Sequence, residues 1–174
     1  MESVRNALVG CGALMYGEFT LASGKKSKYY IDIKKASTNP EVLAIIADEM
    51  ATLLHGRPRP DRIAGVVLGS VPMAVALSLR TGIPFVMVRK EKKDHGTSKL
   101  IEGSLEKGMR VLVVEDVVTS AGSAVYAIDT LRAEGAVVDE ILAVVDREEG
   151  GLQALEAKDV ELRALVTATE VLRQ

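Results

Sequence analysis

The 174-residue sequence has a single cysteine, Cys11, no tryptophan, two phenylalanines and four tyrosines. One cysteine cannot form an internal disulfide, which excludes the disulfide-rich secreted scaffolds. No apolar run is long enough to span a bilayer, which excludes an α-helical membrane protein. Because residues 1–10 carry no secretory signal pattern, we expect a cytoplasmic protein without a membrane partner.

An excess of charge of one sign is also lacking, since 22 basic and 24 acidic residues give a formal net charge of −2. This balance creates no global field that attracts nucleic acid, so we expect no such partner. What is present favours a globular fold, because 48% of the residues are hydrophobic and a chain of this length can bury one substantial core. The sequence shows no internal repeat or interdomain linker and therefore predicts a single domain over residues 1–174.

Segments with the pattern of strands alternate along the chain with segments of helical pattern. Asn39 and Pro40 supply an N-cap and a first-turn proline ahead of a helix over residues 41–54. We predict strands over residues 63–68, 84–89, 111–114 and 137–145, and further helices over residues 72–79 and 124–134. This alternation predicts an α/β fold with a mostly parallel central sheet flanked by helices. The tail from Leu152 onward is expected to form a small cap over the sheet.

The most informative segment is residues 111–123, VLVVEDVVTSAGS. Its apolar start indicates a buried parallel strand, and the small and hydroxylated residues indicate a turn that opens a helix, where free backbone N–H groups bind a phosphate. Glu115 and Asp116 precede this turn and can accept hydrogen bonds from ribose hydroxyls. Neither GxxxxGK[ST] nor GxGxxG occurs, so the segment predicts a site for a phosphorylated sugar. An ordinary strand and turn ending in acids is the alternative for this segment alone.

Residues 111–123 resemble the signature of the type I phosphoribosyltransferases, which bind 5-phosphoribosyl-1-pyrophosphate (PRPP). The resemblance implies the fold of that family, with a small hood built mainly from residues 1–38 with a C-terminal contribution, over a core of about residues 39–150. It implies that Glu115 and Asp116 contact the ribose hydroxyls, and that Asp116 is one of the catalytic residues. The loop that would wrap the 5′-phosphate of PRPP consists of Thr119, Ser120, Ala121, Gly122 and Ser123, and Val117 and Val118 are also expected to contact PRPP.

A charged connection follows the strand expected at residues 84–89. It begins with RKEKKDHGTSK at residues 89–99 and runs for about twenty residues, a length typical of a functional or a disordered loop. Cations here could neutralise a departing pyrophosphate, whereas a solvated charged loop is the alternative. Residues 89–96 also match the mobile catalytic loop of the orotate phosphoribosyltransferases. That resemblance implies diphosphate contacts by Arg89, Lys90, Lys93 and His95, with Lys93 and His95 catalytic.

The same resemblance implies a homodimer, because this loop usually reaches the active site of the neighbouring subunit. It also implies a Mg²⁺ ion that is held mainly through PRPP, without a direct protein ligand. Imidazole titrates near neutrality, so His95 could also protonate a departing oxygen, although charge neutralisation is the favoured role. His55 ends a predicted helix, where a dipole contact explains it, and we assign it no function.

The base would be bound by the amino-terminal part, where residues 19–32 predict two short strands around a Ser-Gly-Lys-Lys-Ser turn. Aromatic residues adjoin lysines in this segment, which suits a planar base that carries a carboxylate. The segment is similar to the orotate-binding hairpin of the same enzymes. The Asp-Arg-x-Glu-Gly pattern at residues 146–150 resembles their second orotate contact, although spacing alone favours surface ion pairs there. The implied orotate contacts are Lys26, Tyr29, Tyr30, Thr119 and Arg147.

One departure from the family pattern lies at residues 68–72, LGSVP, where bacterial relatives often carry a lysine before Gly-Ile-Pro. Backbone N–H groups at Gly69 and at the start of the following helix could compensate for the missing cation.

Together these motifs predict magnesium-dependent transfer of a phosphoribosyl group from PRPP to N1 of orotate. The products would be orotidine 5′-monophosphate and pyrophosphate, in de novo pyrimidine biosynthesis. The alternatives are a phosphoribosyltransferase for another base and a non-catalytic regulator that senses PRPP. A purine has no carboxylate for the expected orotate contacts to pair with, and the sequence has no helix-turn-helix segment that a DNA-binding regulator would use.

Overall fold

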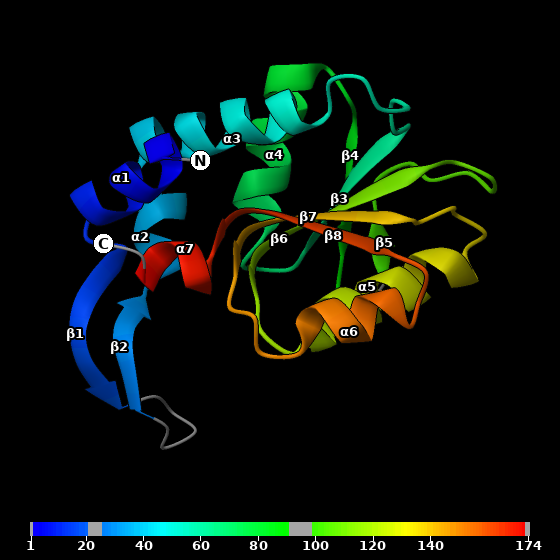
Figure 1. The fold of residues 1–174 in the computed structure, drawn as a ribbon. Helices are drawn as coiled ribbons and strands as arrows, with labels where there is room; N and C mark the ends of the chain where they lie inside the picture. Colours follow the sequence, from blue (N-terminus) through cyan, green and yellow to red (C-terminus); the bar gives the residue numbers. More distant parts are fainter. Residues whose placement is uncertain (1, 21–25, 91–98, 173–174) are drawn as a thin grey trace.

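The computed structural model describes residues 2–20, 26–90 and 99–172. Within these ranges, a six-stranded sheet with the order β5-β4-β3-β6-β7-β8 lies at the centre, and helices cover both faces (Figure 1). Only β4 and β5 pair antiparallel; all other neighbours in this sheet are parallel. The predicted α/β fold with a mostly parallel sheet is confirmed. The strands are β3 (Arg62–Val66), β4 (Phe85–Val88), β5 (Ile101–Glu102), β6 (Val111–Val118), β7 (Glu140–Asp146) and β8 (Glu161–Thr167).

Two layers of helices enclose the sheet (Figure 1). One face is covered by α1 (Glu2–Gly10), α3 (Pro40–Leu53) and α4 (Val71–Thr81), and the other by α5 (Gly122–Ala133) and α6 (Gly151–Glu156). Coverage on both faces explains why β6 and β7 read as nearly continuous apolar runs. In the part of the chain that the structure describes, no helix is long and apolar enough to cross a membrane.

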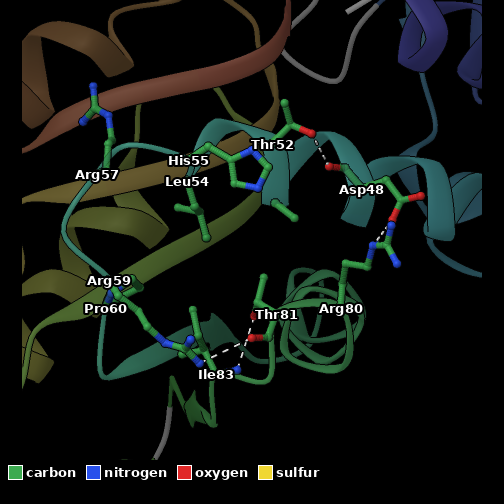
Figure 2. A pocket seen from close by; sticks show the side chains of 11 residues that line it. Asp48, Thr52, Leu54, His55, Arg57, Arg59, Pro60, Arg80, Thr81 and Ile83 are labelled. Carbon is green, nitrogen blue, oxygen red and sulfur yellow. Dashed lines mark hydrogen bonds and ion pairs between the residues drawn. The ribbon is translucent and has the colours of Figure 1, made fainter.

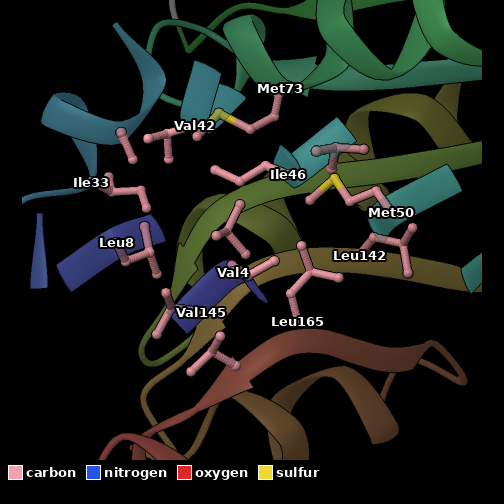
Figure 3. Close-up of a cluster of buried hydrophobic side chains, with 14 of the residues drawn as sticks. Val4, Leu8, Ile33, Val42, Ile46, Met50, Met73, Leu142, Val145 and Leu165 are labelled. Carbon is pink, nitrogen blue, oxygen red and sulfur yellow. The ribbon is translucent and has the colours of Figure 1, made fainter. Parts of the chain in front are cut away.

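The larger hydrophobic cluster lies between the sheet and α1, α3 and α4 (Figure 3). Ile46 and Met50 of α3 and Leu142 of β7 are fully buried in it. Truncation of a buried Ile to Ala costs about 2–5 kcal/mol, so Ile46 is a substantial contributor to stability. A second cluster fills the opposite side, between β6, α5 and α6.

Local signals explain where the helices begin. The side chain of Asn39 accepts hydrogen bonds from the backbone N–H groups of Glu41 and Val42, at 3.1 and 3.2 Å, and Pro40 occupies the first turn of α3. The predicted helix over residues 41–54 is therefore confirmed, one residue longer at its start. α1 was not predicted, although Val4 and Leu8 lie one helical turn apart and are both fully buried.

The predicted end of the strand at residue 114 is wrong, because β6 continues to Val118. Its pairing with β7 extends from Val113 opposite Ile141 to Val118 opposite Asp146. Glu115 and Asp116 therefore lie within the strand. The β7 strand begins at Glu140 rather than 137, since Val137 makes only an isolated bridge with Arg110.

The expected cap from Leu152 onward is wrong for residues 161–167. These residues form β8, which pairs parallel with β7 from Glu140 opposite Glu161 to Asp146 opposite Thr167 and so belongs to the sheet itself. Two short helices flank it, α6 and α7 (Ala168–Leu172). The expected core of residues 39–150 leaves out this edge strand, whose buried residues Leu165 and Val166 complete the cluster in Figure 3.

A two-stranded hairpin stands apart from the sheet (Figure 1). It consists of β1 (Leu14–Thr20) and β2 (Lys26–Ile31), which pair antiparallel, and is followed by α2 (Ile33–Ser37). The hydroxyl of Tyr16 donates to the carbonyl of Val171 in α7 at 3.0 Å, so the C-terminal helix contacts the hairpin. Residues 23–25 of the predicted turn lie outside the described residues.

Candidate active site

A cleft of about 180 Å³ lies at the carboxyl ends of β3 and β6. This is the edge at which open parallel sheets bind ligands. The cleft brings together both acids of the 111–123 segment, the loop after β3, Lys90 from the segment after β4, and the start of α5. Its lining residues are Val66, Val67, Leu68, Gly69, Ser70, Lys90, Glu115, Asp116 and Ser123.

Glycines bring the loop after β3 close to the acids. A Cβ atom at Gly69 would lie 2.7 Å from Oδ2 of Asp116, and one at Gly65 would lie 2.9 Å from the Cβ of Ala74 in α4. Ser70 is fully buried, and its hydroxyl accepts from the N–H of Val66 at 2.7 Å. Ser70 was not singled out from the sequence, because its importance comes from a fold that sets it against Glu115.

The loop lacks a lysine, as the sequence shows, and its backbone is partly engaged. The N–H groups of Ser70 and Val71 donate to the carbonyls of Val66 and Leu68, both at the long distance of 3.4 Å. Bonds of this length are weak and can be exchanged for an anion. At Ser70 and Val71, the expected backbone compensation therefore requires that these two contacts break.

Glu115 is 5% exposed, and its Oε1 atom has no hydrogen-bond partner among the described residues. Burial raises the pKa of Glu115 to about 8, and the neighbouring charge of Asp116 adds to the rise, while the Ser70 hydroxyl and Lys90 oppose it. At pH 7 this carboxyl is therefore largely protonated and can donate a hydrogen bond as well as accept one. The Oδ1 atom of Asp116 accepts a hydrogen bond from the N–H of Val117 at 2.7 Å.

The predicted phosphate loop joins β6 to α5. Val118 is buried and packs toward Gly151, whereas Thr119 and Ser120 are exposed. Ala121 has a φ of 62°, and α5 begins at Gly122, which leaves the N–H groups of the first turn facing outward for an anion.

Two of the expected orotate contacts meet at the base of the hairpin. The guanidinium of Arg147 lies 5.5 Å from the ring centre of Tyr29, a cation–π geometry. The backbone N–H of Arg147 donates to the carbonyl of Val118 at 2.9 Å, which ties it to the phosphate loop, and Glu149 pairs with its Nη2 atom at 2.9 Å. The buried Nε atom of Arg147 has no partner among the described residues.

The other two hairpin residues lie elsewhere. Tyr30 is 41% exposed and stacks on Phe19 with ring centres 5.6 Å apart, because successive residues of a strand face opposite sides. Lys26 is exposed and donates to the hydroxyl of Thr20 at 2.7 Å. The structure therefore brings Tyr29 and Arg147 together but does not bring Tyr30 and Lys26 to them.

Among the expected diphosphate contacts, Arg89 and Lys90 are described and Lys93 and His95 lie outside the described residues. Lys90 lines the cleft, and Arg89 lies 3.8 Å from Glu102 in β5. Within the described ranges, no group of three or more His, Cys, Asp or Glu side chains could hold a metal ion.

A larger pocket of about 430 Å³ lies at the opposite edge of the sheet (Figure 2). It lies where α3 and α4 end, and helix C-termini carry partial negative charge that disfavours a phosphorylated ligand. Two of its three arginines are in ion pairs: Arg80 pairs with Asp48 at 2.5 Å, and Arg57 makes two bonds to Glu161. The third, Arg59, donates to the carbonyl of Thr81 at 3.3 Å. His55, which received no predicted function, also lies here. We therefore place the candidate site in the smaller cleft.

Comparisons with known proteins show which family the chain resembles. Residues 33–167 match the family model described as "Phosphoribosyl transferase domain". The chain is 51% identical over 161 residues to "Orotate phosphoribosyltransferase" of Methanocella arvoryzae, which covers 92% of this chain and 91% of that protein. The orotate phosphoribosyltransferase structure from Aeropyrum pernix has a TM-score of 0.84 at 34% identity, covering 97% and 96% of the two chains. The Mycobacterium tuberculosis enzyme in complex with PRPP has a TM-score of 0.80 at 30% identity, covering 98% and 99%.

Proposed function

The chain belongs to the phosphoribosyl transferase domain family and, within it, to the orotate phosphoribosyltransferases, and from this premise we propose how its residues carry the reaction. The reaction moves a 5-phosphoribosyl group from PRPP to N1 of orotate, as in pyrimidine biosynthesis. The observation that supports the residue roles is the cleft that joins Glu115 and Asp116 to Lys90 and Ser123.

In this proposal the cleft binds PRPP in two parts. Glu115 and Asp116 hold the ribose hydroxyls, and the N–H groups of residues 119–123 hold the 5′-phosphate at the start of α5. The carbon that reacts is then held between fixed groups, and such positioning supplies much of the rate in a transfer reaction.

The bond from C1′ to the diphosphate breaks as the bond to N1 of orotate forms. Positive charge develops on the ribose ring and negative charge on the departing pyrophosphate. The carboxylate of Asp116 stabilises the former, and Lys90, Arg89, Lys93 and His95 neutralise the latter. The N1 proton of orotate is acidic enough that no strong dedicated base is required.

We assign Mg²⁺ to the diphosphate, where the ion supplies charge neutralisation. Magnesium in such sites takes one or two carboxylates together with substrate phosphates and waters. The ion would be bound mainly through PRPP in the cleft, without a direct protein ligand.

Arg147 and Tyr29 are the proposed orotate contacts that the geometry supports best. The unpartnered Nε atom of Arg147 can donate to a ring carbonyl or to the carboxylate, and Tyr29 keeps the guanidinium plane in place. Lys26, Tyr30 and Thr119 remain predicted contacts.

We also propose that the chain acts as a homodimer. Leu68 and Leu79 are 78% and 82% exposed, near the start and end of α4, and Leu68 also lines the cleft. Leu68 precedes α4 and Leu79 lies within it, and we propose that exposed apolar side chains such as these contribute to the interface between subunits. Leu79→Glu should therefore produce monomers in light scattering, whereas Leu152→Glu on the exposed side of α6 should not. If both variants keep the mass of the unmodified chain, α4 is not the interface.

A cytoplasmic location is part of the same proposal, because the half-buried thiol of Cys11 has no cysteine partner and suits a reducing compartment. Fractionation of the source cells, with the chain followed by antibody, tests it. Recovery outside the cytoplasmic fraction would contradict it.

A spectrophotometric assay of orotate consumption with PRPP and Mg²⁺ tests the reaction and the metal together. We expect turnover that is lost with a chelator and restored by added Mg²⁺. Turnover with another base but not with orotate would support the first alternative, and PRPP binding without any turnover would support a regulator.

A further inference from the structure

The hydroxyl of Tyr126, on α5, lies beside the backbone of the segment that carries the first two cations. It donates to the carbonyl of Arg89 at 3.0 Å and lies 3.3 Å from the carbonyl of Lys90. The half-buried ring of Tyr126 packs against the cluster between β6 and α5, so its orientation is restrained. One hydroxyl thus fixes the backbone of two consecutive residues.

Lys90 needs such restraint because its side chain is exposed and long. An unrestrained lysine loses about 2 kcal/mol of rotamer entropy when it is held in one place, and a mobile backbone adds to that cost. Lys90 nevertheless reaches the cleft that Glu115 and Asp116 line, and its charge acts on Glu115. A fixed carbonyl at residue 90 limits the space that the ammonium group explores to this cleft.

α5 connects this restraint to the phosphate loop. Ser123 lies in the first turn of α5 and lines the same cleft. Tyr126 follows three residues later, and residues at this spacing lie on the same side of a helix. The helix that presents the phosphate loop at its start therefore also anchors the segment on the diphosphate side.

We propose that Tyr126 is a positioning residue for the diphosphate end of PRPP: its hydroxyl holds the backbone at residues 89–90 so that the Lys90 ammonium group lies at the cleft. Tyr126 touches no substrate and acts through Lys90. The inference rests on the proposed roles of the cleft and of Lys90.

Tyr126→Phe removes the hydroxyl and keeps the ring. The matched control is Thr130→Val on the same helix, because the Thr130 hydroxyl donates at 2.8 Å to the carbonyl of Tyr126 and not to the cation segment. We expect kcat/KM for PRPP to fall roughly three- to tenfold in Tyr126→Phe, the range for one lost hydrogen bond. The KM for orotate and all constants of Thr130→Val should stay within twofold of the unmodified chain.

A double-mutant cycle with Lys90→Ala separates positioning from a general structural effect. If Tyr126 acts through Lys90, Tyr126→Phe has no further effect on PRPP in the Lys90→Ala background. The proposal would be overturned if the reductions of kcat/KM for PRPP in the two single variants multiply in the double variant. It would also be overturned if Tyr126→Phe raises the KM for orotate as much as the KM for PRPP. Equal kinetics of Tyr126→Phe and Thr130→Val would also overturn it.

Calorimetric titration with Mg²⁺ and pyrophosphate repeats the cycle without turnover, so it remains informative if the proposed reaction fails. Weaker binding by Tyr126→Phe, but not by Tyr126→Phe in the Lys90→Ala background, supports the inference. Equal affinity of Tyr126→Phe and the unmodified chain contradicts it. Absence of orotate turnover in both the unmodified chain and Thr130→Val would instead count against the proposed function.

Discussion

Charged groups are paired differently at the two ends of the parallel strands, which we call the amino-terminal edge and the carboxyl edge of the sheet. At the amino-terminal edge, charges pair with one another: Arg57 with Glu161, Arg80 with Asp48, and the buried Glu140 with Arg163. Among the described residues, three buried side-chain atoms lack a hydrogen-bond partner: Oε1 of Glu115 and Nε of Arg147 at the carboxyl edge, and Nε of Arg163 at the amino-terminal edge. The two Nη atoms of Arg163 are bonded to Glu140 and to the Leu53 carbonyl, so in the described part of the chain only the carboxyl edge has an unpartnered atom on each of two charged groups. Burying such atoms costs free energy unless another group satisfies them.

This difference in the pairing of charges indicates the candidate site better than the volumes of the two pockets do. The larger pocket lies at the edge where ion pairs engage most of the lining charges, while the smaller cleft contains the unpartnered Oε1 atom of Glu115. The partly unsatisfied edge is thus the one suited to bind and transform a charged substrate.

The largest contrast between the edges is expected from carboxylate removal. Asp116→Asn keeps an oxygen for the N–H of Val117 but removes the charge that faces the reacting ribose, so kcat/KM for PRPP should fall about 100-fold or more. Asp48→Asn at the opposite edge should leave kcat/KM within twofold. Steady-state kinetics of the two variants measure this contrast, and equal values would remove the distinction between the edges.

A backbone change sharpens the comparison at the phosphate loop. A Cβ atom at Gly151 would lie 2.6 Å from the carbonyl oxygen of Thr119, so Gly151→Ala must displace the loop. Displacement of about 1 Å can cost up to 100-fold in rate, and we expect a loss of roughly tenfold or more in kcat/KM for PRPP. Gly10→Ala is the control, because nothing lies within 4 Å of its added methyl group. Unchanged kinetics in Gly151→Ala would show that the loop is not held as we describe.

The raised pKa of Glu115 predicts how stability depends on pH. Its pKa rises from 4.5 to about 8, so between these values the folded chain keeps a proton that the unfolded chain has lost. Stability therefore falls as pH rises through this window, with a slope of up to about 1.4 kcal/mol per pH unit. In urea unfolding between pH 5 and 8, the free energy of unfolding of Glu115→Gln should depend less on pH than that of the unmodified chain. The exposed Glu156→Gln should keep the pH dependence of the unmodified chain. A slope identical in Glu115→Gln and the unmodified chain would contradict the assignment.

The smallest effect is expected from an exposed ion pair at the amino-terminal edge. Arg80 and Asp48 are 60% and 55% exposed at their side chains, and such pairs contribute about 0–1 kcal/mol. Arg80→Ala should lower the free energy of unfolding by no more than this and leave the kinetics unchanged. A change in kcat/KM would show that the ion pair at the amino-terminal edge affects catalysis in the cleft.

Local sequence patterns predicted most elements because their signals lie within a few residues. Asn39 and Pro40 marked the start of α3, and apolar runs marked β3, β4 and β7 to within a few residues. The end of β6 was misplaced because acids normally end a buried strand, whereas pairing with β7 carries this strand through both of them. β8 was missed because only its partner β7 makes its mixed sequence a strand.

The candidate site was predictable where its residues are consecutive. Glu115, Asp116 and the loop to Ser123 form one segment and lie together in any fold that makes a strand and a helix of it. The same reasoning could not separate Tyr29 from Tyr30, because it lacked the strand register that faces one to Arg147 and the other to solvent. Ser70 and Tyr126 carried no sequence signal, since each matters only through a residue distant in the chain.

The sequence by itself determined a parallel α/β sheet, a turn of small and hydroxylated residues after two acids, and a charged segment after β4, because each depends on near neighbours in the chain. The tertiary structure alone decided that Gly69 and Ser70 close over the acids, that Lys90 reaches them and that Arg147 lies on Tyr29. The physical reason is that burial sets the charge state of Glu115 and the partner of each cation, and burial is a property of the assembled layers.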